Sequence, residues 1–124
     1  MRSLSDLIRL AGEREMDLHE AILAADSEAT GVPSEQIFEL ISSRLKDMCR
    51  SAEEASCSNN PCKLVRKTGP LMRKYSDKGG MSGDFILRAS AIALEVATYN
   101  ASMGRIVAAP TAGSCGILPG MLFA

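Results

Sequence analysis

The chain contains no tryptophan, and tyrosine and phenylalanine together make only 4% of its 124 residues aromatic. No apolar run approaches the ~20 residues that a membrane-spanning helix needs. The N-terminal segment has no apolar stretch behind its first arginine, so it does not match a secretory signal. These absences predict a cytoplasmic protein, in which the four cysteines are reduced thiols or metal ligands rather than disulfides.

Charge of neither sign is in excess, because 14 basic residues stand against 15 acidic ones and the formal net charge is −1. We therefore expect neither nucleic acid nor an anionic membrane as a partner. Alanine, leucine, isoleucine and seven methionines dominate the apolar residues, and these favour helices over strands. A chain of this length forms a single domain. Together with the helix-forming composition, this predicts an all-α fold, a small helical bundle.

Residues 1–55 carry the clearest helical periodicity. Two capping-box patterns each precede apolar residues at helical spacing, and Ser34 caps a third, longer stripe after a Gly-Val-Pro break. Three amphipathic helices with short loops are typical of an antiparallel bundle. The sole histidine, His19, lies in the second helix, and we assign it no catalytic role. The capping boxes are Ser3 with Asp6 and Asp17 with Glu20.

Residues 56–83 are predicted to form a basic, glycine-rich connector with at most a short helix after Gly69-Pro70. The spacing of Cys49, Cys57 and Cys62 is wider than the C-x-x-C pairs of metal sites, so we interpret them as incidental thiols. Six basic residues between 63 and 78 form either a solvated face or a surface that meets an acidic partner domain. The basic residues are Lys63, Arg66, Lys67, Arg73, Lys74 and Lys78.

Residues 84–124 are predicted to form a helix followed by a glycine-rich loop. The helix begins at Asp84 and stops at Gly104, a natural C-terminal residue. In the loop, residues 108–120, glycines allow successive amides to turn toward one point and form an anion-binding nest. A second helix beginning at Ile117 would add its N-terminus to that site. The alternative is a turn of small residues where two helices pass closely.

The loop matches neither common nucleotide motif. A P-loop places lysine directly after its last glycine, whereas Ile117 follows Gly116, and no G-x-G-x-x-G occurs. A carboxylate therefore fits better than a phosphate. Ser114 and Cys115 have no nearby base to activate them, and G-x-S-x-G is absent. We accordingly assign no catalytic residue to this chain.

The segment Asn100–Val107, running into Pro110–Gly116, closely resembles the α chain of the iron–sulfur-dependent L-serine dehydratases (L-serine ammonia-lyases). Lys78–Gly83 and residues 1–56 are similar with weaker motifs, although Cys57 and Cys62 have no counterpart in the family's pattern. The resemblance implies elimination of water from L-serine to give pyruvate and ammonia. A 4Fe-4S cluster would act as Lewis acid on the hydroxyl, its cysteines being expected downstream of Ala124.

The resemblance also implies a substrate site around the loop. Amides of the loop and the hydroxyls of Thr111 and Ser114 would hold the substrate carboxylate, Asn100 would donate to the carboxylate or to the loop, and Ser82 with Gly83 would shape the opposite wall. The base would come from a Ser-rich, His-containing motif of a β chain or β domain. The implied substrate-binding residues are Thr111, Ala112, Gly113, Ser114, Cys115, Gly116, Asn100, Ser82 and Gly83.

The uncapped apolar segment Gly120–Ala124 leads us to expect an N-terminal fragment of a larger all-helical catalytic domain, inactive and without a cofactor by itself. Its expected partners are L-serine, the β chain and the remaining α chain, and a homo-oligomer is compatible with the sequence. Two alternatives stay open. One is a fragment of a pyridoxal-phosphate lyase using Lys67, Lys74 or Lys78. The other is a non-catalytic helical interaction module with methionine-rich faces.

Overall fold

The computed structural model describes residues 3–58 and 65–124, and within them it contains six α-helices, one 3-10 turn and no strand. The predicted all-α fold is confirmed. The chain divides into two compact units, unit 1 (Met1–Ser43) and unit 2 (Arg44–Ala124), which are described separately. The boundary lies inside the third helix rather than near residue 55, because the C-terminal half of that helix contributes Ala55 to the core of unit 2.

Unit 1 consists of α1 (Leu4–Glu13), α2 (Leu18–Thr30) and the first residues of α3 (Ser34–Cys57). Both predicted capping boxes form. The amide of Ser3 donates to Asp6 at 3.0 Å, and the amide of Asp17 donates to Glu20 at 3.0 Å. The α2 helix ends at Thr30, and the cap residue Gly31 that follows has a φ of 71°, which is accessible to glycine at little cost. Local sequence signals therefore determine where these helices begin and end.

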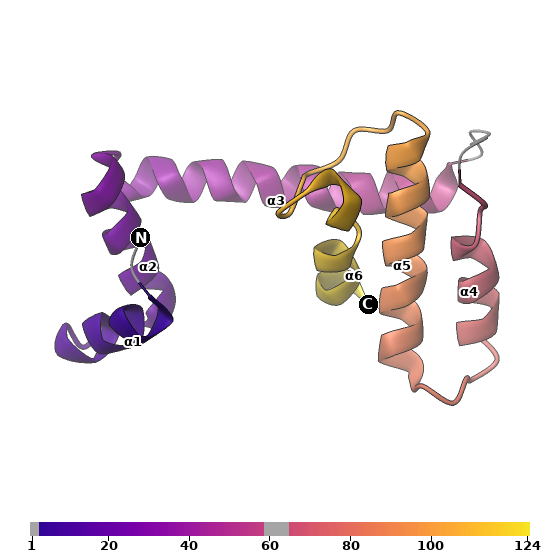
Figure 1. Cartoon of the computed structure of the whole chain (residues 1–124), viewed down its shortest axis with the longest axis horizontal. Coiled ribbons are helices and arrows are strands. Elements are labelled where there is room, and N and C mark those ends of the chain that lie inside the picture. Colours follow the sequence, from indigo (N-terminus) through magenta and orange to yellow (C-terminus); the bar gives the residue numbers. More distant parts are fainter. Residues whose placement is uncertain (1–2, 59–64) are drawn as a thin grey trace. The chain divides into compact units, whose positions relative to one another are not determined.

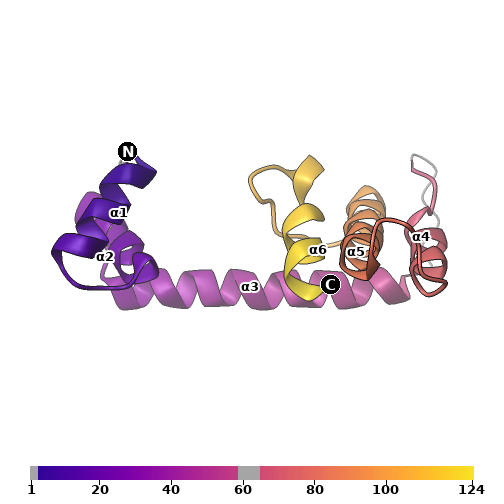
Figure 2. The ribbon, with the colours of Figure 1, turned by 90° about the horizontal axis from the view of Figure 1, so that it is seen from below.

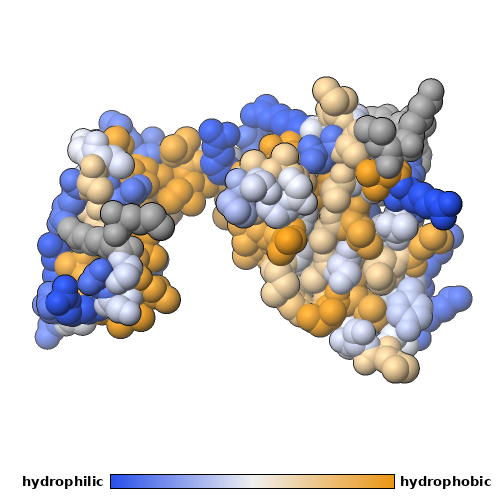
Figure 3. Space-filling model, viewed as in Figure 1, coloured by the Kyte–Doolittle hydropathy of each residue, from blue (hydrophilic) through white to orange (hydrophobic). Residues whose placement is uncertain are grey.

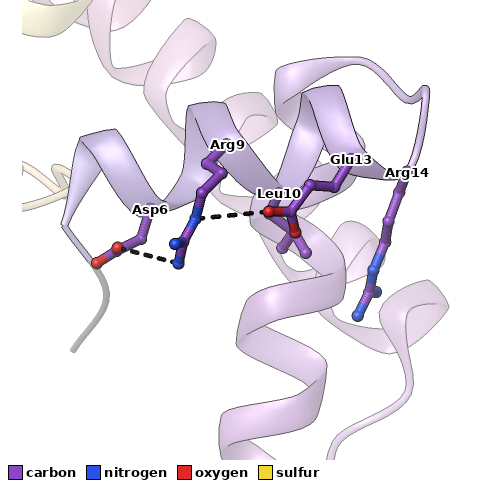
Figure 4. A pocket seen from close by; sticks show the side chains of 5 residues that line it. All are labelled: Asp6, Arg9, Leu10, Glu13 and Arg14. Atoms are coloured by element: carbon purple, nitrogen blue, oxygen red, sulfur yellow. Dashed lines mark ion pairs between the residues drawn. The ribbon is translucent and has the colours of Figure 1, made fainter.

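A solvent-exposed hollow on α1 is lined by charged side chains that pair with one another. Arg9 lies 3.7 Å from Asp6 and 3.7 Å from Glu13, as Figure 4 shows, and Arg14 contacts Glu28 at 3.1 Å. Exposed pairs of this kind stabilise a fold by about 1 kcal/mol or less. Because these charges are matched within the helices, we interpret the hollow as ordinary surface.

Unit 2 contains the rest of α3 with α4 (Gly69–Ser76), α5 (Asp84–Ala101), the 3-10 turn η1 (Ala112–Ser114) and α6 (Ile117–Phe123). In Figures 1 and 2, α4, α5 and α6 stand in a row alongside this part of α3. The predicted connector 56–83 thus includes a packed helix. Its start lies so close to α5 that a β-carbon at Gly69 would be 2.4 Å from Cγ of Glu95.

The α4 and α5 helices are joined by a charged pair. Arg73 donates through Nε to one carboxylate oxygen of Glu95 at 3.0 Å and through a second nitrogen to the other. Glu95 is only 5% exposed, and the guanidinium supplies the two-pronged partner that a buried carboxylate requires. The bond to Glu95 raises the pKa of Arg73 further above its usual value.

The α6 helix packs against α5 through two glycines four residues apart. A β-carbon at Gly116 would lie 2.2 Å from the carbonyl oxygen of Ala93, and one at Gly120 would lie 2.5 Å from that of Ala89. Residues at this spacing share one helix face, so the two backbones are in direct contact. The sequence analysis offered, as an alternative, small residues where two helices pass closely. The positions of Gly116 and Gly120 agree with that alternative.

The core of unit 2 is small and lies under the loop that joins α5 to α6. Ala55, Val96 and Cys115 are buried there, with Ile92 and Tyr99 packed around them. Apolar side chains also remain on the visible surface, where orange atoms interrupt the hydrophilic ones in Figure 3. None of the helices in residues 3–58 and 65–124 combines the length and hydrophobicity that crossing a bilayer requires.

Candidate functional site

The glycine-rich loop begins where α5 stops. The amide of Gly104 donates to the Tyr99 carbonyl at 2.8 Å, and a β-carbon at Gly104 would lie 2.4 Å from the Tyr99 ring. The chain then runs without regular structure to a cis bond between Ala109 and Pro110. It next turns through η1 and enters α6. The residue order and the end of α5 thus place residues 109–116 beside the last turn of that helix.

Ser114 organises the interior of the loop. Its hydroxyl lies 3.0 Å from the Ala109 carbonyl, 3.2 Å from the Thr111 carbonyl and 3.0 Å from the Thr111 hydroxyl. It also accepts the Thr111 amide at 3.3 Å. A hydroxyl has one proton and two lone pairs. If its proton goes to Ala109, both lone pairs are used by Thr111, so Ser114 has no remaining capacity for a ligand.

Two of the loop amides are already paired inside the turn. Ser114 donates to the Thr111 carbonyl at 3.2 Å, and Cys115 donates to the Ala112 carbonyl at 3.5 Å. In the part of the chain that the structure describes, the amides of Ala112, Gly113 and Gly116 donate to no protein group. Ala112 and Gly113 are exposed, whereas Gly116 is buried. The unpaired amides that belong to exposed residues are therefore those of Ala112 and Gly113.

Asn100 connects the loop to α5. Its side-chain amide donates to the Ala112 carbonyl at 3.1 Å. Donation to the loop is one of the two contacts that the sequence predicted for this residue. The bond holds the Ala112 peptide, whose neighbouring amide belongs to Gly113. Asn100 thus fixes the peptide unit that carries the Gly113 amide.

The Cys115 thiol points into the protein core. The residue is 1% exposed and packs with Ala55 and Val96. Burial raises the pKa of the Cys115 thiol, which keeps it protonated and unreactive. Cys115 therefore offers a ligand no side-chain contact, and its amide is engaged by Ala112. Its inclusion among the predicted substrate-binding residues has no support from this geometry.

Ser82 and Gly83 lie away from the loop. Gly83 precedes α5 with a φ of 79°, whereas Asn100 is in the last turn of the same helix. An α-helix rises 1.5 Å per residue, so the 18 residues of α5 separate these ends by about 27 Å. One amino-acid ligand cannot contact both. The structure does not bring the predicted opposite wall to the loop.

Two contacts from α3 hold the last turn of α5 and the start of the segment that follows it. The Tyr99 hydroxyl donates to Glu54, and this bond is the main cause that raises the pKa of Tyr99. Arg105 contacts the Asp47 carboxylate at 3.0 Å. The partners are 45 and 58 residues apart in sequence, and no local pattern marks them, so sequence reasoning missed both.

Candidate cofactor ligands do not gather in the described residues. Residues 3–58 and 65–124 contain no group of three or more His, Cys, Asp or Glu arranged to hold a metal ion. Cys49 is half-buried, Cys57 is exposed and Cys115 is buried, while Cys62 lies outside the described residues. The donor set present here does not fit an iron–sulfur cluster.

The lysines proposed for a pyridoxal-phosphate enzyme have no room for that cofactor beside them, because the hollow that Lys67 lines has a volume of only about 20 Å³. Lys67 donates to the Ser58 carbonyl at 3.4 Å, and Lys74 and Lys78 are exposed. A Schiff-base lysine is activated by an apolar pocket or a neighbouring cation. None of the three has that environment in the described structure.

The segment that forms the candidate site is also similar in sequence to known proteins. A family model described as "Serine dehydratase alpha chain" matches residues 13–124. The chain belongs to this family. Its similarity to serine dehydratase alpha chains includes the loop, α5 and α6, the part of the molecule that forms the candidate site.

Two curated proteins are similar over the whole chain. The "L-serine dehydratase, alpha chain" of Peptoniphilus asaccharolyticus is 31% identical over 127 residues, covering 100% of this chain and 44% of the relative. The "Probable L-serine dehydratase, alpha chain" of Bacillus subtilis (strain 168) is 32% identical over 130 residues, covering 99% of this chain and 42% of the relative. The chain thus spans less than half the length of these relatives. No solved structure matches it.

Proposed function

We propose that this chain forms part of an L-serine dehydratase, a lyase that eliminates water from L-serine to give pyruvate and ammonia. Membership in the serine dehydratase alpha chain family carries this proposal. The reaction needs its substrate held so that the hydroxyl and the α-proton face the catalytic groups. The role we assign to residues 109–116 is to hold the amino-acid end of that substrate.

The exposed amides of Ala112 and Gly113 are the donors for the serine carboxylate. They are next to each other and donate to no protein group in the described residues. Neutral N–H groups that bond to a carboxylate form charge-assisted hydrogen bonds, which are shorter and stronger than neutral ones. The Asn100 bond to the Ala112 carbonyl (3.1 Å) supports this role because it fixes the peptide plane before the substrate arrives.

Thr111 serves the other end of the amino acid. When Ser114 donates to Ala109, the Thr111 hydroxyl gives its proton to Ser114 at 3.0 Å. Its lone pairs then remain as acceptors. The Thr111 oxygen would accept from the ammonium group of serine, while the two neighbouring amides donate to its carboxylate. The loop would therefore recognise an α-amino acid rather than a simple acid.

The catalytic groups of the proposed reaction lie outside these residues. The family resemblance implies a 4Fe-4S cluster and a base in a β chain or β domain, but the described residues contain no fitting ligand set. We derive no chemical step from the cluster here. Our proposal assigns to this chain substrate binding, and to the rest of the assembled enzyme the cluster ligands and the base.

The test uses Thr111→Val in the assembled enzyme, with this sequence joined to the remaining α chain, combined with the β chain, and reconstituted anaerobically with iron and sulfide. A hydrogen bond to a charged group contributes about 1.5–3 kcal/mol, so the KM for L-serine should rise about tenfold or more with little change in kcat. Thr111→Ser, which keeps the hydroxyl, is the matched control. An unchanged KM in the valine variant would remove the loop from the substrate site.

The 124-residue chain by itself provides a second check. It should release no pyruvate from L-serine under the same anaerobic conditions, because the base and cluster ligands are assigned elsewhere. Serine-dependent turnover by the chain alone would contradict that assignment.

A further inference from the structure

The α6 helix is apolar on every side. Its residues, Ile117–Phe123, include no charged or hydrogen-bonding side chain, and a helix that is hydrophobic all round is normally buried. Gly116 and Gly120 bring one side of α6 against the backbone of α5. In Figure 2, α6 stands at one end of the row that it forms with α4 and α5. The side of α6 away from α5 therefore needs a further cover.

Four large side chains form this uncovered side, which we call the α6 face. Ile117 and Met121 are one turn apart, as are Leu118 and Leu122, so the four occupy two neighbouring rows. With about 3.6 residues per turn, both rows lie across the helix from the two glycines that meet α5. The exposed fractions are 62% for Ile117, 42% for Leu118, 51% for Met121 and 54% for Leu122. Four such side chains next to one another are typical of an interaction surface.

The longer relatives indicate what covers the α6 face. This chain aligns with 44% of one curated α chain and 42% of the other, so more than half of each relative lies outside the matched part. A segment joined to this chain reaches the α6 face by an intramolecular step, at a higher effective concentration than a separate molecule. The rest of the α chain is therefore favoured as the occupant over a β chain or a second copy.

We propose that the α6 face is where the remaining part of the α chain packs, through a helix that presents apolar side chains. Because α6 begins directly after residues 109–116, this packing also brings the remaining part of the chain close to the candidate substrate site. The proposed function assigns the cluster ligands to the rest of the enzyme, so α6 would help to set their position relative to the substrate. The packing rests on family membership, and only its consequence for the substrate rests on the proposed function.

Met121 allows the cover to be measured directly. A methionine-selective oxaziridine, used anaerobically, labels exposed thioethers, and mass spectrometry gives the labelling rate of each methionine. In the 124-residue chain Met121 should be labelled readily, whereas Met48, which is 5% exposed, should be labelled slowly and is the internal reference. In the complete α chain, without the β chain, burial should lower the rate at Met121 about tenfold or more, toward that of Met48.

Three outcomes of this labelling would overturn the proposal. The first is an unchanged rate at Met121 in the complete α chain. The second is protection that appears only after the β chain is added, which would make the β chain the occupant. The third is protection already present in the 124-residue chain, which would mean that a second copy or another part of this chain covers the face.

Two substitutions at Met121 test the same surface by stability. M121L keeps an apolar side chain of similar volume, a change that cores tolerate, whereas M121E brings a charge to the face. In the 124-residue chain both variants should unfold at the urea concentration of the parent, because this side chain is half-exposed. In the complete α chain M121L should stay near the parent, and M121E should lower the folding equilibrium constant about a hundredfold, as burial of an unpaired charge does.

Equal urea midpoints for M121E and M121L in the complete α chain would contradict the buried position of Met121. Neither the labelling nor the unfolding measurement uses serine turnover. A failure of this proposal is therefore distinguishable from a failure of the proposed function, which the KM of the Thr111→Val enzyme decides.

Discussion

Unit 1 and unit 2 are stabilised in different ways. In unit 1, capping boxes at Ser3 and Asp17 define the helices, and few large side chains are buried. In unit 2, the defining contacts join residues far apart in sequence, as between Arg73 and Glu95 or Gly116 and Ala93. The difference indicates that unit 1 tolerates substitutions that would be costly at the tightly packed positions of unit 2.

The largest expected effect compares two glycine-to-alanine changes. Gly116→Ala would place a β-carbon 2.2 Å from the Ala93 carbonyl oxygen, and overpacking of this kind costs about 3 kcal/mol of unfolding free energy. Gly12→Ala in α1 meets no atom within 4 Å, and alanine's helix propensity should make it neutral or stabilising by up to about 1 kcal/mol. Urea unfolding of both variants measures the contrast. Equal effects would show that the α5–α6 contact is not closely packed.

The next effect compares two arginines. Arg73→Met leaves the buried Glu95 carboxylate without its partner. Full burial of such a charge would cost 3–5 kcal/mol, but Arg73 is half-exposed, so we expect about 1–2 kcal/mol after solvent screening. Arg9→Met removes only exposed pairs and should change stability by under about 0.5 kcal/mol. Thermal unfolding distinguishes the two, and a larger loss for Arg9→Met would contradict the comparison.

A smaller effect concerns the connection of the loop to α5. Asn100→Asp keeps the size of the side chain but removes the N–H that donates to Ala112, which should cost about 1 kcal/mol. In the assembled enzyme we expect a KM for L-serine raised about fivefold and, in the chain, faster hydrogen exchange at Cys115, whose amide donates to the same Ala112 carbonyl. Raised KM without faster exchange would instead indicate direct contact of Asn100 with the substrate.

The smallest effect is a pH dependence at Tyr99. Its bond to Glu54 raises the pKa of Tyr99 above the ordinary value of 10.0. The unfolded chain therefore loses this proton first, so the stabilising contribution is complete below about pH 10 and declines as the pH rises toward the higher folded value. Tyr99→Phe should remove that decline between pH 9 and pH 11, which are about one unit on either side of the ordinary pKa. An identical pH profile in both proteins would exclude the contribution.

The features that could be predicted from the sequence are those that depend on residues close together in the chain. Capping residues and helical spacing gave the all-α class and the starts of α1 and α2, because these features depend on neighbours three or four residues away. The packing of α4 on α5 could not be predicted, because it depends on Gly69 meeting Glu95. The same applies to the contacts of Glu54 and Asp47 with residues around the end of α5.

The candidate site shows the same limit. Glycine spacing predicted a loop with inward amides, but it could not reveal that Ser114 and Cys115 pair theirs within the turn. The helix predicted from Asp84 to Gly104 already placed Ser82 before its start and Asn100 near its end, yet the family resemblance assigned both residues to one site. Sequence motifs collect residues by likeness to relatives, whereas helix length and hydrogen-bond capacity decide which of them meet.

Two contacts tie the loop to α5. Asn100 holds Ala112 by its side chain, and Ala93, two turns earlier, meets Gly116 through the backbone. Both contacts come from the same helix, so Ala112 and Gly116 are positioned relative to one another by α5. A binding partner that shifted or rotated α5 would therefore also shift the amides of Ala112 and Gly113. Substrate binding at the loop could in this way be controlled through the position of α5.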